Sequence, residues 1–341
     1  MQYHKLIKIP TLIVLLLFNT MILAQTTKAS EKGDVKHFIE KMVHQYHFKQ
    51  EKLQALFNKV QVNQHAIDLM NTPYEMKPWY LYRKHFIQEN RIQQGVIFWR
   101  QHRHILATVA QRTGVPAEYI IAIIGVESRY GKTEGTFPAF DILYTFAFHY
   151  PRRADFFRNE LKEYLLLCRE QQWDPLSIHG SYAAALGQAQ FMPSNYRIYA
   201  KSYDDAKHID LFNSEADVIA SIANYFYLHG WQRNQPVASQ AIVIGQQYKQ
   251  LPIQDRNSKI SKLKMTLAQL QHFGVRPAQS HAADLKATFM RFDLKNKEIY
   301  WLGFHNFYVI TRYNTSKLYA LAIYQLATQI KQQYQRRYQK I

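Results

Sequence analysis

The sequence predicts a mainly helical protein with a smaller β-containing part. The chain has 341 residues, of which 47% are hydrophobic, enough for one large core or two smaller ones. It contains only 12 Gly and 11 Pro, which disfavours a loop-rich β architecture. Long stretches repeat apolar residues at intervals of three and four, the spacing of amphipathic helices.

Charge and cysteine content restrict the classes of function. The chain carries 43 Lys and Arg against 25 Asp and Glu, a formal net charge of +18. Such a surface attracts a polyanion: nucleic acid, anionic lipid or an acidic cell-wall polymer. Cys168 is the only cysteine, so an intrachain disulfide and a cysteine-cluster zinc site are excluded. No HExxH pair is present, and no cofactor is expected.

The N-terminus has the layout of a secretory signal peptide. Lys5 and Lys8 precede an apolar run over residues 11–24, and a polar stretch follows. The run is shorter than the roughly 20 residues that span a bilayer, which disfavours a permanent membrane helix. We therefore expect a signal peptide over 1–24 and a linker over 25–34. Export makes nucleic acid a poor partner.

The first part of the mature chain predicts a helical domain over residues 35–110. Residues 35–60 read as two amphipathic helices. Pro73 and Pro78 interrupt the helical pattern with an aromatic-rich connection. A further helix is expected over residues 91–112.

The middle of the chain, residues 111–235, predicts a core. Pro116 stands where a first-turn proline starts a helix, and the next residues are apolar nearly all round, so this helix belongs inside the core. Further helices are expected over residues 153–172, 182–200 and 215–230.

The last part of the chain, residues 236–341, changes pattern. Alternating and β-branched residues over 235–248 and 284–304 predict a few strands. A closing helix with a basic end is expected over residues 318–340, completing the helical domain.

Glu127 stands out because it follows the apolar run IIAIIGV near the expected end of a helix. Burial and the partial negative charge of a helix C-terminus both raise the pKa of a carboxyl group. A carboxyl that is protonated near neutral pH can act as a general acid on a leaving-group oxygen. The alternative is a structural glutamate paired with Arg129 or another basic residue, and helical spacing does not decide between them.

The stretch GSYAAALGQAQFMPSNY, residues 180–196, resembles the lining of a sugar site in composition. Small residues let a ligand approach the backbone, while glutamine amides and aromatic rings suit hydroxyl groups and C–H faces. Close packing of helices is the alternative explanation for the run of alanines.

Five ordered motifs resemble the membrane-bound lytic murein transglycosylase B family: GVESRYG, FHYPRRADFF, the 180–196 stretch, ANYFYLHGW and YWLGFHNFYVITRYN. The similarity runs from about Lys77 to Tyr319. It implies a lysozyme-like catalytic core within a helical protein, with Glu127 as the sole catalytic carboxylate. It also implies a set of residues that bind the glycan: Tyr82, Arg152, Arg153, Ser181, Gln190, Phe191, Met192, Tyr225, Tyr308, Tyr313 and Asn314.

The resemblance also implies a mechanism that needs one carboxylate. The C6 hydroxyl of N-acetylmuramic acid would attack its own anomeric carbon, cleaving the β-1,4 bond to N-acetylglucosamine and forming a 1,6-anhydro end. Intramolecular attack has a large effective-molarity advantage. A hydrolytic muramidase and a non-catalytic peptidoglycan-binding protein are the alternatives.

The chain departs from many relatives at a calcium-binding loop. Here Ser202 and Ala206 replace expected ligands, and Lys207 replaces the turn glycine, so no metal is expected. The acids of this degraded loop are Asp204, Asp205, Asp210 and Asp217. No cysteine follows the signal peptide, so a lipid anchor is excluded. We expect a periplasmic protein whose partners are peptidoglycan glycan strands and other cell-wall enzymes, with no nucleic acid.

Overall fold

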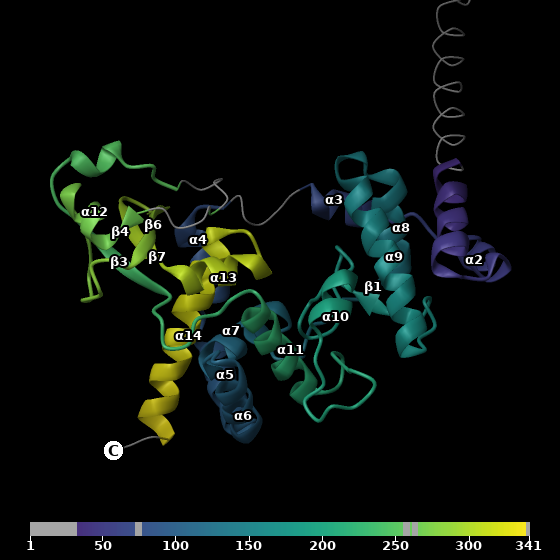
Figure 1. Ribbon diagram of the computed structural model, residues 1–341, viewed down its shortest axis with the longest axis horizontal. Coiled ribbons are helices and arrows are strands. Elements are labelled where there is room, and N and C mark those ends of the chain that lie inside the picture. Colours follow the sequence, from purple (N-terminus) through teal and green to yellow (C-terminus); the bar gives the residue numbers. More distant parts are fainter. Residues whose placement is uncertain (1–32, 72–76, 255–259, 261–264, 339–341) are drawn as a thin grey trace, which may run out of the picture.

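The computed structural model describes residues 33–71, 77–254, 260 and 265–338 (Figure 1). The predicted signal peptide and nearly all of the predicted linker lie outside this range. Within it, no helix combines the length and the apolar character needed to cross a bilayer. The described protein is mainly helical with a small antiparallel sheet, as the sequence predicts.

The N-terminal helices follow the predicted pattern. Residues 33–46 form the first helix, and Gln50–Phe57 form α2. The next helix, α3 (Gln64–Met70), begins where the Asn63 side chain accepts a hydrogen bond from the Ala66 amide. Part of the segment expected to be a connection is instead helical, as α4 (Trp79–Phe86).

The helix predicted over residues 91–112 is two helices, α5 (Glu89–Gln101) and α6 (Arg103–Thr113). The chain leaves the helical conformation at His102, whose φ is −108°. In one continuous helix Leu106 would be rotated by about 80° from Val96. The break lets both of these side chains be buried, and Gly114, in the left-handed region, ends α6.

The predicted central helix is α7 (Ala117–Glu127), which follows Pro116. Every residue from Ile120 to Gly125 is buried. It packs against α5, α6, α11 (Glu215–Leu228) and α14 (Lys317–Tyr338) (Figure 1). Its buried Glu118 accepts a hydrogen bond from Lys331 Nζ of α14 at 2.8 Å, which compensates the buried charge.

The helix predicted over 153–172 is α9 (Ala154–Gln171), and it packs against α8 (Ala139–His149), which the pattern analysis missed. A short 3₁₀ turn, η2 (Pro151–Arg153), joins them. Ahead of α8, β1 (Phe137–Pro138) pairs antiparallel with β2 (His179–Gly180).

The helix predicted over residues 182–200 is wrong for most of its length. Only α10 (Pro193–Tyr199) is helical. Ala184, Gly187 and Gln190 have φ of +61°, +61° and +50°, and left-handed residues cannot continue a right-handed helix. The predicted helix over 215–230 is confirmed as α11 (Glu215–Leu228).

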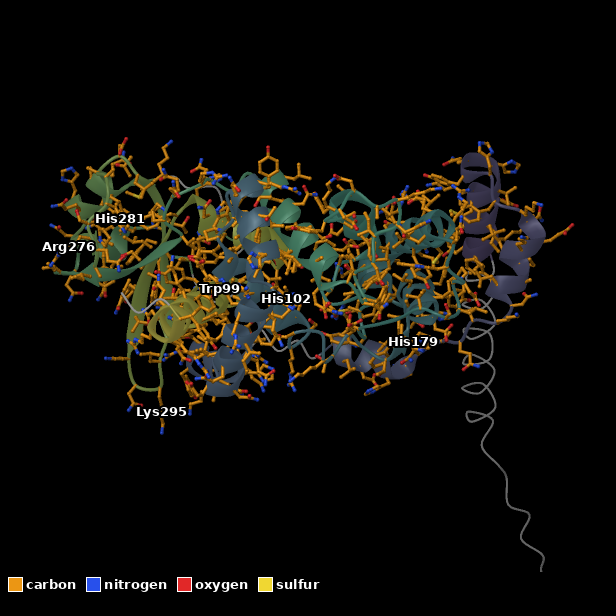
Figure 2. All side chains as sticks on the ribbon, turned by 90° about the horizontal axis from the view of Figure 1, so that it is seen from below. Trp99, His102, His179, Arg276, His281 and Lys295 are labelled. Atoms are coloured by element: carbon orange, nitrogen blue, oxygen red, sulfur yellow. The ribbon has the colours of Figure 1, made fainter. Side chains whose placement is uncertain are left out.

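The C-terminal part contains the predicted strands and closing helix. The order of the antiparallel sheet is β4-β6-β7-β3-β5. Lys295 marks the tip of the β6–β7 hairpin (Figure 2). The elements are β3 (Ala238–Val243), η3 (Gln247–Gln250), β4 (Met265–Thr266), α12 (Leu267–His272), β5 (Val275–Pro277), β6 (Lys286–Asp293), β7 (Glu298–Gly303), α13 (His305–Tyr313) and α14 (Lys317–Tyr338).

Gly135 is expected to be essential for stability because its backbone touches strand β2. Its φ is +96°, and a Cβ would lie 2.0 Å from the Gly180 carbonyl oxygen. Gly135→Ala should therefore lower the free energy of unfolding, measured in urea, by at least about 2 kcal/mol more than a matched control substitution lowers it. The control is Gly245→Ala, which has φ of +75° but open space around it, and which should cost about 1 kcal/mol. Equal losses would contradict this account.

Candidate active site

Glu127 is the last residue of α7 and is partly buried. The chain then turns sharply: Arg129 and Tyr130 have φ of +51° and +61°. The Tyr130 hydroxyl donates to the Arg91 carbonyl at 2.7 Å, and the Tyr130 amide donates to the Ile124 carbonyl at 3.3 Å. Two non-glycine residues in this conformation store strain, and surrounding contacts hold them directly beside the candidate acid.

A tyrosine from the far end of the chain holds Glu127. The Tyr319 hydroxyl, on α14, donates a hydrogen bond to Glu127 Oε1. Burial raises the pKa of Tyr319 well above its ordinary value, and the negative charge of Glu127 raises it further. The hydroxyl therefore keeps its proton and remains a donor. The sequence analysis assigned Tyr319 no role, although a tyrosine on the apolar face of a helix needs a partner for its hydroxyl.

An aromatic cluster joins α11, α13 and the 180–192 segment. The rings of Phe191, Tyr225 and Tyr313 lie with centroids 4.9 to 5.7 Å apart. The Tyr313 hydroxyl donates to the Ala189 carbonyl at 2.6 Å. Burial and the negative charge of Glu127 raise the pKa of Tyr313, which shows that the cluster lies within electrostatic reach of Glu127.

The 180–192 segment is tied to the loop that follows α7. Gln190 Nε2 donates to the carbonyls of Gly187, at 2.9 Å, and Glu134, at 3.1 Å. The Ser181 hydroxyl oxygen accepts hydrogen bonds from the Ala183 and Ala185 amides. These bonds, rather than a helix, give the small-residue segment its shape.

Four other predicted residues lie on or beside the elements that form this group. Tyr82 is buried on α4, stacks on Trp79, and lies within electrostatic reach of Tyr319. Met192 is the residue before α10. Tyr308 lies under the Arg312 guanidinium, at 4.4 Å, while Asn314 ends α13 and accepts a hydrogen bond from the Ser316 amide.

Arg152 and Arg153 lie in the connection between α8 and α9. Both are exposed in η2, at the end of α8 away from β1. The 11 residues of α8 correspond to about 16 Å. Arg153 lies over the ring of Phe156 at 4.2 Å.

Hydrogen bonds within the loop hold the acids of the degraded calcium site. Asp204 accepts from the Ser202 hydroxyl, and Asp205 pairs with Lys201. Asp210 accepts from the amides of residues 212 and 213, and Asp217 from those of residues 203 and 210. Among the described residues, no three His, Cys, Asp or Glu side chains gather as a metal site requires.

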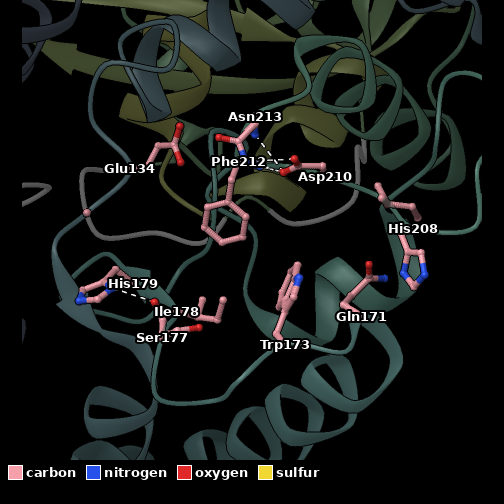
Figure 3. A pocket seen from close by; sticks show the side chains of 12 residues that line it. Glu134, Gln171, Trp173, Ser177, Ile178, His179, His208, Asp210, Phe212 and Asn213 are labelled. Atoms are coloured by element: carbon pink, nitrogen blue, oxygen red, sulfur yellow. Dashed lines mark hydrogen bonds between the residues drawn. The ribbon is translucent and has the colours of Figure 1, made fainter.

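A cavity of about 470 Å³ opens beside the loop after α7 (Figure 3). Glu134 lines it, and burial raises the pKa of this carboxyl to about 7, with Asp210 and Glu215 adding negative charge. The sequence analysis assigned Glu134 no role. Its cavity could not be predicted, because most of the other lining residues come from distant segments.

These features together define an enzyme of the glycan-cleaving class. One glutamate ends a buried helix and is held by a buried tyrosine, an aromatic cluster lies within its electrostatic reach, and that cluster adjoins a segment with a glutamine amide. Such a combination suits acid catalysis on a sugar, whose hydroxyl groups bind amides and whose C–H faces pack on rings.

Comparisons with known proteins identify the family. Residues 30–328 match the family model of the transglycosylase SLT domain. Membrane-bound lytic murein transglycosylase B of Escherichia coli (strain K12) is 38% identical over 303 residues, 86% of this chain and 81% of the relative. The chain therefore belongs to the transglycosylase SLT domain family and is a lytic murein transglycosylase, a lyase that cleaves glycosidic bonds.

Solved structures agree with this assignment. The soluble lytic transglycosylase SltB1 of Pseudomonas aeruginosa is 43% identical with a TM-score of 0.79, over 88% of this chain and 98% of that one. SltB3 of the same organism, in complex with NAG-NAM-pentapeptide, is 26% identical with a TM-score of 0.76, over 89% and 79% of the two chains. The mainly helical fold with a small sheet is that of lytic transglycosylases.

Removing the Tyr319 hydroxyl should impair catalysis. Tyr319→Phe deletes a hydrogen bond to a carboxylate, which contributes about 1.5 to 3 kcal/mol, so kcat/KM on peptidoglycan should fall roughly 10- to 100-fold. The pH profile of kcat/KM should also shift, since the hydroxyl favours the ionised form of its partner.

Tyr324→Phe is the matched control for this variant. Tyr324 lies on the same helix but is rotated by about 140° from Tyr319, so its hydroxyl points elsewhere. This control should keep its rate and its pH profile. Similar losses in both variants would show that Tyr319 acts only through packing.

Proposed function

We propose that the protein cleaves the β-1,4 bond between N-acetylmuramic acid and N-acetylglucosamine, leaves 1,6-anhydromuramic acid ends, and uses Glu127 as its single acid and base. The observation that carries this proposal is the position of Glu127, at the end of a buried helix and oriented by the Tyr319 hydroxyl. An oriented, partly buried carboxyl group is what general acid catalysis requires.

In the first step Glu127 protonates the glycosidic oxygen as the bond to the anomeric carbon breaks. Phe191 and Tyr225 are buried and support the partly exposed Tyr313, whose ring packs against a sugar face. The polar groups of Ser181 and Gln190 bind hydroxyl or acetamido groups. Because the buried rings and the hydrogen bond to the Ala189 carbonyl fix the ring of Tyr313, it holds the sugar in one pose.

In the second step Glu127, now a carboxylate, accepts the proton of the C6 hydroxyl as that oxygen attacks the anomeric carbon. No water is consumed, and the nucleophile is already part of the substrate. Effective molarities of well-oriented intramolecular reactions reach about 10⁵ to 10⁸ M, which removes the need for a second protein carboxylate. The N-acetyl group of the substrate can assist.

The substrate is a long acidic polymer, which agrees with the charge of the chain. The net charge of +18 attracts peptidoglycan, whose stem peptides carry carboxylates. Arg152 and Arg153, exposed at the end of α8 away from β1, would bind acidic groups of the strand. The signal peptide predicted from the sequence would deliver the protein to the periplasm, where this polymer lies.

The products of sacculus digestion test the reaction. Wild-type protein should release fragments whose muramic ends are lighter by one water than hydrolysed ends, as mass spectrometry would show. Glu127→Gln should lower the rate at least about a hundredfold while keeping binding to sacculi. Glu51→Gln, an exposed glutamate of α2, is the matched control and should keep full activity.

Three outcomes would contradict the proposal. Hydrated ends would make the protein a muramidase, and intact sacculi with bound protein would make it a binding protein. Full activity of Glu127→Gln would show that another group is the acid.

A further inference from the structure

The cavity beside the loop after α7 has a composition that differs from the rest of the surface. It holds about 470 Å³ and is lined by two carboxylates, two histidines and several aromatic and aliphatic side chains (Figure 3). In a chain with a net charge of +18, no Lys or Arg is among its lining residues. The cavity therefore selects against anions and offers a place for a cation.

Glu134 is the group that a cation would contact. Asp210 already accepts hydrogen bonds from the Phe212 and Asn213 amides, so its negative charge is partly compensated. Among the described residues, no hydrogen bond or ion pair engages the Glu134 side chain, and the charges of Asp210 and Glu215 repel it. A bound cation would relieve this repulsion and favour the ionised carboxylate.

The walls of the cavity suit the alkyl chain that carries such a cation. The rings of Trp173 and Phe212 meet edge to face, with centroids 5.7 Å apart. Figure 3 shows Glu134 and His179 on one side of these rings and His208 on the other. Methylene groups pack well on aromatic faces, and an ammonium group at the end of the chain would reach the carboxylate.

The cavity is connected to the candidate active site by short stretches of chain. Gln190, a predicted glycan-binding residue, donates to the Glu134 carbonyl at 3.1 Å. His179, which lines the cavity, lies two residues before Ser181, a separation of at most about 7 Å between Cα atoms. A group attached to a glycan strand bound at Ser181 and Gln190 can therefore enter the cavity.

We propose that this cavity binds the ammonium-bearing side chain of a diamino acid in the peptide attached to the glycan strand. Glu134 is the counter-ion, and Trp173 and Phe212 pack on the methylene groups. This inference rests on the proposed function, because it places the peptide of a peptidoglycan strand next to its cleavage site. It makes Glu134 a specificity-determining residue for strands with free side-chain amines.

Selective acetylation of the substrate tests the proposal. One batch of peptidoglycan strands keeps the free side-chain amine, and a second batch is N-acetylated at that amine. Wild-type kcat/KM should be about three- to tenfold higher on the free-amine strands, as expected for one partly buried ion pair. Glu134→Gln should reduce this ratio to about one, and the matched control Glu51→Gln should keep it.

Strands without peptides separate this inference from the proposed function. If the wild type cleaves them but shows no preference between the free and acetylated strands, the amine site is wrong and the cleavage reaction stands. If Glu134→Gln keeps the preference, Glu134 is not the counter-ion and the inference fails.

If the protein cleaves no strand, the inference is tested by binding alone. Isothermal titration calorimetry then measures the dissociation constants of a soluble disaccharide-peptide in its free-amine and acetylated forms. Tighter binding of the free-amine form than of the acetylated form, lost in Glu134→Gln, supports the site. Equal dissociation constants overturn it. Unchanged binding of the acetylated form by Glu134→Gln shows that the variant is folded.

Discussion

The burial of α7 is the constraint on which the rest of the structure depends. A helix that is apolar on all sides must be covered on all sides. Helices α5 and α6 come from earlier in the chain, α11 follows the small-residue segment, and α14 comes from the C-terminus. Because α7 ends at Glu127, the helices that cover it also fix where the carboxyl group lies and how much water reaches it.

The position of Glu127 explains why the closing helix belongs to the site. A carboxylate at a helix C-terminus lies against partial negative charge, and partial burial adds a desolvation cost. The Tyr319 hydroxyl compensates for this cost by donating a hydrogen bond to the carboxyl group. Burial keeps the hydroxyl protonated, so it remains a donor. Tyr313 adds a second element from the same end of the chain. The candidate site thus needs residues from both the predicted core and the C-terminal part.

The sequence predicts those parts of the fold that depend on local pattern. The central helix was predictable because its apolar run and the preceding proline act locally. The strands were predictable because apolar and polar residues alternate along them. The error over residues 182–200 arose because Gly187 and Gln190 take left-handed conformations that close contacts and hydrogen bonds impose. The role of Tyr319 was missed because it too depends on a contact between distant parts of the chain. Its partner, Glu127, lies 192 residues earlier, and no spacing rule connects the two.

The two signs of charge in this protein act over different distances. The excess of Lys and Arg attracts an acidic polymer to the surface as a whole. Salt screens this attraction beyond about 8 Å at physiological ionic strength, so the attraction cannot select one group on a strand. The acidic cavity acts only on a group that enters it, where burial strengthens each interaction. A strand that carries both carboxylates and amines is therefore attracted by the surface and then positioned by the cavity, whose carboxylate lies seven residues from the acid that would cleave it.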